Sequence, residues 1–325
     1  ITPYWGQNNP IYIITFVFGL PLNILAFVTF LRKFKQKVIS VDILLFNLTL
    51  SDLVLLAFLP FRIVEAASEM EWRMPYFICP FSLCVHFSSN YINSFLLTAI
   101  SVERYLAVGF PLRYKRLVKP LYIIVGIVCI WILSTTHCSI FYIVDHFAPE
   151  KANKTNVSIC YSQFSPVQLQ VLLPIRLEVF FLLFCIPFMV TTFCSISFVH
   201  IMVTQPFISR KRKLRAIGLV TVTMINFILC FMPYNVSHVV GFIQGDNPPW
   251  RMHALLFSTF NATLDPIMFY FCSVSYQKMH LEDLLYIMNK TRLGAHRDNC
   301  LELFKKDHEE PHGLDVTEDY KDHGF

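Results

Sequence analysis

The chain has 325 residues, of which 55% are hydrophobic and only 15% are charged. A soluble domain carries roughly 25% charged residues, so this composition indicates a protein whose surface faces lipid. The formal net charge of +5 is too small to indicate a nucleic-acid partner, and none is expected. No assembled nucleophile or metal-ligand motif stands out, so we do not expect an enzyme.

Seven nearly uncharged stretches follow one another along the chain, at residues 11–31, 41–66, 77–107, 120–144, 174–203, 214–243 and 252–272. Each reaches the roughly 20 residues that a helix needs to cross the hydrocarbon core of a bilayer. Helices are expected because lipid cannot satisfy an unpaired backbone group. The sequence therefore predicts an all-α membrane protein, a seven-transmembrane helix bundle over residues 11–272 that follows a short N-terminus at 1–10. The first stretch is long enough to be a span rather than a signal peptide.

The loops between these stretches differ in their content of basic residues. Lys and Arg are frequent in the first, third and fifth loops, around positions 32–37, 113–119 and 210–215, and scarce in the other three. Basic loops of membrane proteins lie on the cytoplasmic side. We therefore expect a multi-pass protein of the plasma membrane with its N-terminus outside and its C-terminus inside.

The segment after the seventh stretch divides into two parts. Residues 273–289 have helical apolar spacing and predict an amphipathic helix, the eighth, on the inner membrane surface. Residues 290–325 are polar and predict a disordered cytoplasmic tail, whose segment at 319–322 resembles an epitope tag. Thr291 and Thr317 are the only Ser or Thr residues of this tail, so we expect weak phosphorylation-dependent recruitment of arrestin as a partner.

Polar residues occur inside several spans, where they are costly and therefore indicate a functional or structural site. Two are carboxylates, Asp52 in the second span and Asp265 in the seventh. Ser89, Asn93 and Asn261 are predicted to join Asp52. Such a cluster can hold a Na⁺ ion or a water network. A satisfied hydrogen-bond network with a purely structural role is an equal alternative.

Several spans carry a short motif at a characteristic depth in the membrane. Glu103-Arg104-Tyr105 ends the third span at the inner face, where an arginine beside a carboxylate can form a two-state switch. Pro187, Pro233 and Pro266 are expected to kink their helices. Together with Asn23, Asp52, Trp131, Cys230–Pro233 and Asp265–Phe269, this set resembles the rhodopsin-like G-protein-coupled receptors.

The resemblance implies that eight residues take part in activation and G-protein coupling: Glu103, Arg104, Tyr105, Phe231, Pro233, Asp265, Pro266 and Phe269. Three positions depart from the family pattern: Phe231 replaces a common Trp, and Phe269 and Ser195 replace common tyrosines. The resemblance also implies a heterotrimeric G protein as partner, of the inhibitory class or alternatively of the phospholipase-coupled class.

Two cysteines differ from the others because they lie at the outer, oxidising side of the membrane. The resemblance implies that these two, Cys79 and Cys160, form a disulfide that ties the second outer loop to the third span. In the same loop, Asn153 and Asn156 begin acceptor triplets for glycosylation.

The outer half of the bundle carries two arginines, Arg176 on the fifth span and Arg251 at the start of the seventh. Two guanidinium groups in a partly dry pocket repel each other unless an anion lies between them. A carboxylate suits both, because each guanidinium can donate a forked pair of hydrogen bonds to it. Tyr234 and His238, one turn apart on the sixth span, can complete its shell. The alternatives are a solvated helix end for Arg251 and an ion pair with Glu178 or a lipid phosphate for Arg176.

These outer segments also resemble the free fatty acid receptors, and among them the short-chain group. The resemblance rests on 42–56, Leu59–Arg62, His137–Ser139, Leu173–Glu178, Pro233–His238 and Trp250–Arg251. It implies a carboxylate site lined by Arg176, Arg251, His137, His238, Tyr91 and Tyr234. His238 favours short acids, whereas Ser162 stands where a short-chain member has Glu.

The expected function is a receptor activated by short-chain carboxylic (free fatty) acids. The main alternative is a receptor of the same fold for another small anion, such as a hydroxy acid, a lipid or a nucleotide. A transporter is a weaker alternative, because no internal repeat is apparent. A retinal photoreceptor is excluded, because residues 252–272 contain no Lys.

Overall fold

The computed structural model of the protein describes residues 9–35, 38–68, 72, 74–75, 77–140, 143, 160 and 166–272. These residues belong to one compact unit, Ile1–Val274, whereas a second unit, Ser275–Phe325, lies outside the described part. The expected surface helix at 273–289, the tail with Thr291 and Thr317, and the acceptor residues Asn153 and Asn156 also lie outside the described residues.

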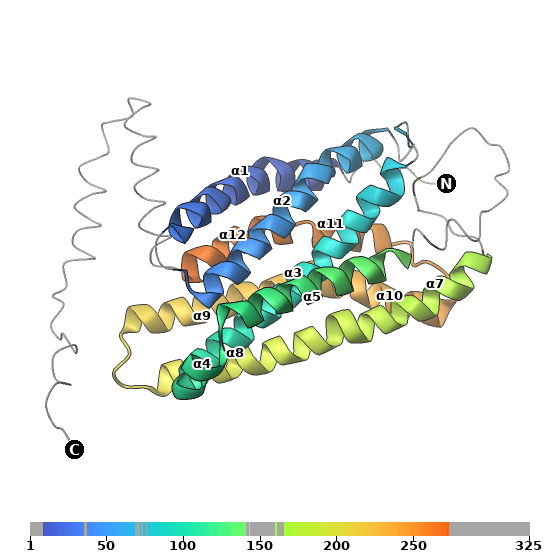
Figure 1. Ribbon diagram of the computed structural model, residues 1–325. Helices are drawn as coiled ribbons and strands as arrows, with labels where there is room; N and C mark the ends of the chain where they lie inside the picture. The colour runs from blue at the N-terminus through green and yellow to red at the C-terminus, as the bar shows by residue number, and fades with distance from the viewer. Residues whose placement is uncertain are drawn as a thin grey trace, which may run out of the picture. The chain divides into compact units, whose positions relative to one another are not determined.

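The described residues form helices and no strands, and the first helices run alongside one another (Figure 1). They are α1 (Asn9–Phe34), α2 (Ser40–Ala67), α3 (Ile78–Gly109), α4 (Pro111–Leu117) and α5 (Pro120–Cys138). The short helix α4 follows α3 on the side of the bundle that carries the basic loops, which is called the inner side below and the opposite side the outer side. It was not predicted, because it is too short to produce an apolar stretch. Pro111 begins it, at the position where a missing backbone N–H costs no hydrogen bond.

The fifth and sixth spans each contain one π-helical segment. The fifth consists of α7 (Pro166–Val179), η2 (Phe180–Cys185) and α8 (Ile186–Thr204). The sixth consists of α9 (Arg210–Ile225), η3 (Asn226–Phe231) and α10 (Met232–Gln244). Pro187 and Pro233 are the second residues of the helices that follow the π segments, where the wider turn just before them accommodates a residue that lacks an N–H donor. Both helices extend beyond the predicted apolar stretches, because hydrophobicity indicates the span and not the helix ends.

The seventh span is broken, whereas the sequence predicted one continuous stretch at 252–272. It consists of α11 (Arg251–Ser258) and α12 (Asn261–Cys272). At the break, the Thr259 hydroxyl donates to the carbonyl of Leu256 (2.7 Å), so a side chain competes with the helical pattern. Pro266 cannot donate to the carbonyl of Ala262. That carbonyl instead accepts a hydrogen bond of 2.6 Å from Nδ2 of Asn23 on α1.

The surface of the bundle is apolar. Five helices of the described part are long and apolar enough to cross a membrane: Pro10–Phe34, Ser40–Ala67, Pro120–Cys138, Val167–Thr204 and Arg210–Gln244. Only 17% of the α5 span is buried inside the protein, so most of that helix faces outward with apolar side chains. With α3 and the broken α11–α12 pair, these helices confirm the predicted seven-transmembrane fold.

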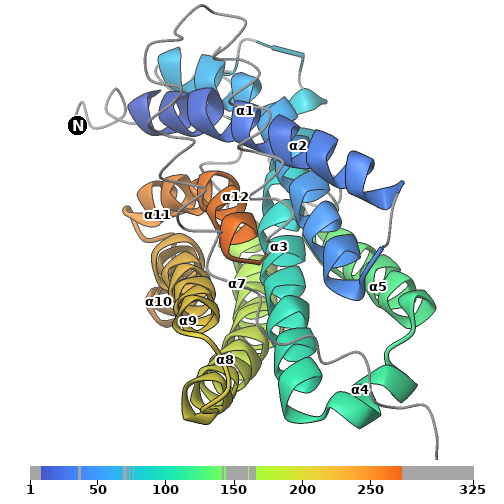
Figure 2. The same ribbon diagram turned by 90° about the vertical axis from the view of Figure 1, so that its left-hand side faces the viewer.

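Helix α3 lies in the middle of the bundle, where it packs against α2, α5 and α8 (Figure 2). This position explains its composition, because a helix that does not face lipid can carry polar residues. Its buried polar residues are Ser82, His86, Ser88, Ser89, Asn90, Asn93, Ser94, Ser101 and Glu103. Each of the candidate sites contains or adjoins a residue of α3.

Candidate functional site

Four side chains form one hydrogen-bonded network in the outer half of the bundle. Nη2 of Arg251 donates to the hydroxyl of Tyr234 (2.7 Å), and Nη1 lies 3.2 Å from Nδ1 of His238. Nε2 of His238 lies 3.3 Å from the hydroxyl of Tyr91. Because an arginine can only donate, Nδ1 of His238 accepts, and the proton of the neutral ring is on Nε2. The guanidinium also lies over the Tyr234 ring, 5.0 Å from its centroid.

Arg176 lies beside this network on α7. Its side chain is only 2% exposed, and its charge acts on Arg251, Tyr234 and Tyr91. Arg251 is 8% exposed, so both guanidinium groups are withdrawn from water. Nη1 of Arg176 donates to Oδ1 of Asn247 (2.6 Å). Asn247 was not predicted, because it lies in a loop whose path the sequence does not indicate.

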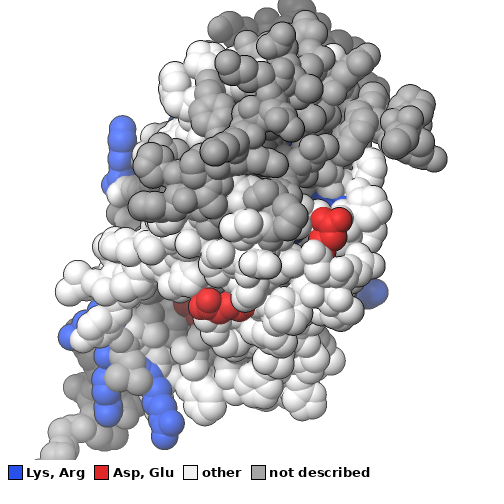
Figure 3. Space-filling view, turned by 90° about the vertical axis from the view of Figure 1, so that its right-hand side faces the viewer, with Lys and Arg blue, Asp and Glu red and all other residues white. Residues whose placement is uncertain are grey.

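One end of the bundle has mainly uncharged side chains among the described residues. Figure 3 shows this face, the right-hand side of Figure 1, with a few Asp or Glu and Lys or Arg side chains among the uncharged ones. The two arginines therefore contribute charge from inside the bundle rather than from its surface.

His137 lies apart from the four-residue network. Its Nδ1 atom is 3.0 Å from the carbonyl of Leu133, one turn earlier on α5. Its Nε2 atom is 3.8 Å from Oε1 of Glu178 on α7. Among the described residues, the carboxylate next to His137 is thus that of Glu178, whose side chain is 54% exposed. The sequence did not predict this neighbour.

Below the network, a narrow cavity separates the outer site from the middle of the bundle. Phe87 stacks on Tyr234, with ring centroids 5.6 Å apart, and closes one side of the network. The residues that line the cavity are Asn90, Tyr91, Ser94, Leu183, Phe231, Tyr234, Asn235 and Ser258. Phe231 is one of the predicted activation residues, so the outer site and that residue adjoin the same cavity.

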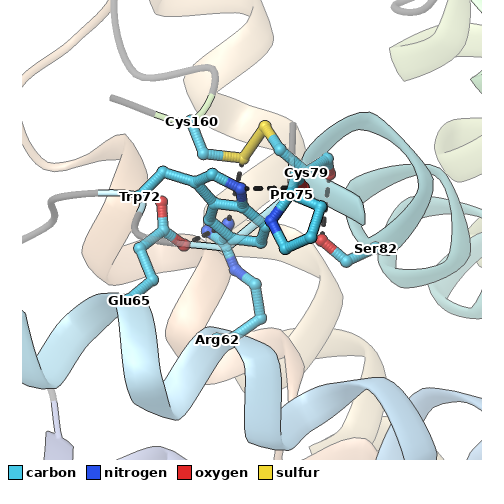
Figure 4. The surroundings of a disulfide bond; sticks show 7 residues. All are labelled: Arg62, Glu65, Trp72, Pro75, Cys79, Ser82 and Cys160. Carbon is cyan, nitrogen blue, oxygen red and sulfur yellow. Dashed lines mark hydrogen bonds and ion pairs between the residues drawn. A yellow bond between two sulfur atoms is a disulfide. The ribbon is translucent and has the colours of Figure 1, made fainter. Parts of the chain in front are cut away.

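The predicted disulfide between Cys79 and Cys160 is confirmed, with Cα atoms 5.8 Å apart. Figure 4 shows the side chain of Arg62 pointing from α2 toward the sulfur atoms of this disulfide, with Glu65 beside Arg62. Arg62 and Glu65 form an ion pair of 2.5 Å in which both side chains are buried. The sequence contained a signal for this pair, since opposite charges three residues apart on one helix share a face.

The second site lies around the two buried aspartates. Nδ2 of Asn93 donates to Oδ1 of Asp52 (2.7 Å), so these two members of the predicted cluster are in direct contact. Asp265 accepts a hydrogen bond of 2.6 Å from Asn226 on η3, a partner that was not predicted. The two carboxyl groups also interact with each other. Among the described residues, no donor reaches the Oδ2 atom of either aspartate.

Two further predicted members of that cluster make local contacts. The hydroxyl of Ser89 donates to the carbonyl of Ser51 (3.4 Å), directly before Asp52. Oδ1 of Asn261 accepts from the backbone N–H of Ala262 (2.7 Å) at the start of α12. Both residues are buried, but neither has a direct side-chain hydrogen bond to Asp52 among the described contacts.

At the inner end of α3, Glu103 accepts a hydrogen bond from the hydroxyl of Tyr114 on α4. Burial and the adjacent Glu103 carboxyl raise the pKa of Tyr114 to about 12, so its hydroxyl remains a donor at neutral pH. Arg104 lines a cavity with Ser195 and Thr223, which come from the fifth and sixth spans. Tyr105 packs edge-on against Phe110 (5.8 Å between ring centroids).

Aromatic rings connect the fifth and sixth spans near Phe231. Phe184 stacks on Phe188 (5.7 Å between centroids), Phe188 contacts Phe227 (5.8 Å), and Phe227 contacts Phe231 (5.5 Å). This row of rings couples the position of η3 to that of the fifth span. Of the other predicted activation residues, Pro233 and Pro266 lie in α10 and α12, and the side chain of Phe269 lies outside the described part.

Comparison with known proteins gives a consistent set of relatives. The profile of the family described as "7 transmembrane receptor (rhodopsin family)" matches residues 22–269. The chain is 41% identical to "Free fatty acid receptor 3" of Mus musculus over 311 residues, which cover 95% of each chain. It is 46% identical to "Free fatty acid receptor 2" of Homo sapiens over 264 residues, covering 81% of this chain and 80% of the relative. The corresponding receptor 2 of Mus musculus is 44% identical over 313 residues, which are 94% of this chain and 95% of the relative.

Proposed function

Because the chain belongs to the rhodopsin family of seven-transmembrane receptors, we propose that it is activated by short-chain carboxylic acids and signals through heterotrimeric G proteins. It is a multi-pass membrane protein and a receptor, not an enzyme. The proposal includes the plasma membrane as its location, with the N-terminus outside, in agreement with the basic residues of the first, third and fifth loops.

The pair of buried arginines is the observation that carries this proposal. Arg251 is held by Tyr234 and His238, and Arg176 lies close enough to act on the same residues. Two buried positive charges that repel each other favour an anion between them. A carboxylate has the planar geometry that accepts forked hydrogen bonds from a guanidinium group. The names of the relatives, free fatty acid receptors 2 and 3, agree with a carboxylate ligand.

The size of the ligand limits its affinity. Acetate has about four non-hydrogen atoms, and the best small ligands gain about 1.5 kcal/mol for each of them. The limit is therefore about −6 kcal/mol, which corresponds to a Kd of about 40 μM. Because part of this energy is lost in ordering the site, we expect activation at about 0.1–1 mM.

The proposed mechanism is a shift between two populations of the receptor. A carboxylate that binds more tightly when the outer pocket is contracted stabilises the state with an open inner face. The row of phenylalanines from Phe184 to Phe231 packs the fifth span against the sixth, next to the cavity that the outer site adjoins. At the inner face, Arg104 and the exposed Leu112 (83% exposed) are proposed to contact the G protein. The inhibitory class is proposed first, with the phospholipase-coupled class as the alternative; arrestin is proposed as a weak partner.

Dose–response curves of wild-type receptor in cells, for the acid series from formate to decanoate, test the proposed function. We expect the short acids to activate a G protein at about 0.1–1 mM. A receptor that reaches the cell surface but ignores every acid would remove the carboxylate assignment. Hydroxy acids, lipids and nucleotides would then be the ligand classes to test.

We also propose that the Asp52 site holds a Na⁺ ion. The observation behind this is that two interacting carboxyl groups, Asp52 and Asp265, each have an Oδ2 atom that no described donor reaches. Oxygen atoms of carboxylates are suitable ligands for a hard cation, and a cation relieves their mutual repulsion. A proton shared by the two carboxyl groups is the alternative.

Asp52→Asn is expected to remove the dependence of signalling on sodium. In membranes of wild type, replacing Na⁺ by a large organic cation should change the potency of propionate by about fivefold or more, a typical coupling between sites. In Asp52→Asn the same replacement should have no effect, because the site loses one of the two carboxylates that would hold the ion. Asp42→Asn serves as the control, since Asp42 pairs with Lys33 at 2.6 Å in another part of the bundle. Equal sodium dependence in wild type and Asp52→Asn would favour the shared proton.

A further inference from the structure

The third outer loop places Asn247 against one of the two buried arginines. This loop joins α10 to α11 at the end of the bundle where α7, α10 and α11 lie together (Figure 1). Oδ1 of Asn247 accepts a hydrogen bond of 2.6 Å from Nη1 of Arg176. Because Arg176 is almost fully buried, this bond forms away from bulk water, where it restrains the guanidinium strongly.

The conformation of the loop explains why Asn247 reaches Arg176. Gly245 ends α10 with a φ of 71°, a left-handed conformation that glycine adopts without strain. The Asp246 carboxylate accepts from the backbone N–H of Asn247 (2.6 Å), and the Pro248 carbonyl accepts from that of Arg251 (3.0 Å). A Cβ on Gly241 would lie only 3.0 Å from the Asp246 carbonyl oxygen, so the loop packs closely on α10. These contacts give the loop a defined path over the site.

We infer that Asn247 is a positioning residue of the carboxylate site, which holds the Arg176 guanidinium in the orientation that receives the ligand. This inference rests on the proposed function, because it assigns Asn247 a role in the same site. An arginine side chain has many rotamers, and restricting them in advance lowers the entropy that ligand binding must overcome. A neutral amide does this without cancelling the positive charge that attracts the carboxylate.

The same loop also determines where the second arginine lies. Arg251 begins α11 four residues after Asn247, and its backbone N–H is bonded to the loop through Pro248. The hydrogen bond between Asn247 and Arg176 therefore connects the fifth span to the segment that carries Arg251. A ligand that binds both guanidinium groups loses less free energy to ordering them, because the loop already fixes the distance between Arg176 and Arg251.

Two substitutions at this position separate orientation from charge. Asn247→Ala removes the amide, and the concentration of propionate for half-maximal response should rise about 3- to 10-fold, the range that corresponds to the net contribution of one typical hydrogen bond. Asn247→Asp keeps the size of the side chain but adds a carboxylate beside Arg176. An internal carboxylate competes with the ligand, so the rise should be larger, about 30-fold or more. The maximal response should not change, because the inner face is untouched.

The matched control is Gln244→Ala, which removes an exposed side-chain amide at the end of α10. It should leave the potency of propionate unchanged. In an Arg176→Lys background, Asn247→Ala should have a smaller effect than in wild type, because lysine has no planar fork to orient. Potency is compared at equal surface expression of all variants.

The outcomes distinguish this inference from the proposed function. If both Asn247 variants respond to propionate like wild type, or more potently, the role of Asn247 is overturned while the carboxylate function remains. If Asn247→Ala does not reach the cell surface, the isosteric Asn247→Asp alone tests the role of Asn247: lower propionate potency supports it, and wild-type potency overturns it. If wild type itself does not respond to propionate, the proposed function fails and the role of Asn247 fails with it.

Discussion

Replacing Arg251 with alanine is expected to abolish the response to short carboxylic acids. The substitution removes one of the two guanidinium groups that bind the carboxylate, and it leaves Tyr234 and His238 without their shared donor. Removing one partner of a buried, hydrogen-bonded charge pair costs about 2–5 kcal/mol, so potency should fall about 30-fold or more. For a ligand that acts near millimolar, such a loss places activation beyond any usable concentration.

Arg251→Lys refines this test, because it keeps the positive charge but removes the planar pair of N–H donors that a guanidinium group presents. Lysine cannot donate simultaneously to Tyr234 and His238 in the geometry of the guanidinium, and it loses the planar contact with the Tyr234 ring. We expect partial function, with potency about tenfold below wild type. Glu178→Gln is the control, since Glu178 is a largely exposed carboxylate that contacts His137 on the outer side. An Arg251→Ala receptor that responds like wild type at equal surface expression would contradict the two-arginine site.

The sequence allowed the fold to be predicted because lipid imposes simple rules on a spanning helix. Apolar length indicated each span, whereas the direction that the distribution of Lys and Arg indicates stays a prediction. The break between α11 and α12 escaped this reasoning, since Thr259 and Asn261 act through side-chain hydrogen bonds to the backbone that do not change the hydrophobicity of the stretch. Helix α4 was not predicted because a helix of seven residues, most of them exposed, leaves no apolar stretch in the sequence.

For the candidate sites, the sequence indicated residue types more reliably than their partners. Polar residues in spans pointed to Asp52 and Asn93, because a buried charge requires a donor nearby. The partners Asn226, Tyr114 and Asn247 were not predicted, since periodicity shows which face of a helix is buried but not which helix packs against it. The same limit explains His137, whose described ion-pair neighbour is Glu178 on another helix.

The central claim is that two buried guanidinium groups recognise the negative charge of a small carboxylate. Propionate and propionamide provide a direct comparison, because they have the same size and nearly the same shape but differ in charge. An amide has one carbonyl acceptor and no charge to offer, and its NH₂ group places donors against the donors of Arg176 and Arg251. Hydrogen bonds between charged groups are worth about 1.5–3 kcal/mol each, so losing even one should weaken the ligand about 10- to 100-fold.

The measurement is a pair of dose–response curves for G-protein activation by propionate and propionamide in wild-type receptor, at constant pH, sodium concentration and osmolarity. We expect half-maximal activation by propionate at about 0.1–1 mM and no activation by propionamide at concentrations about tenfold higher. Activation by propionamide with the potency of propionate would show that the receptor does not recognise the negative charge of its ligand. This result would contradict the proposed role of Arg176 and Arg251.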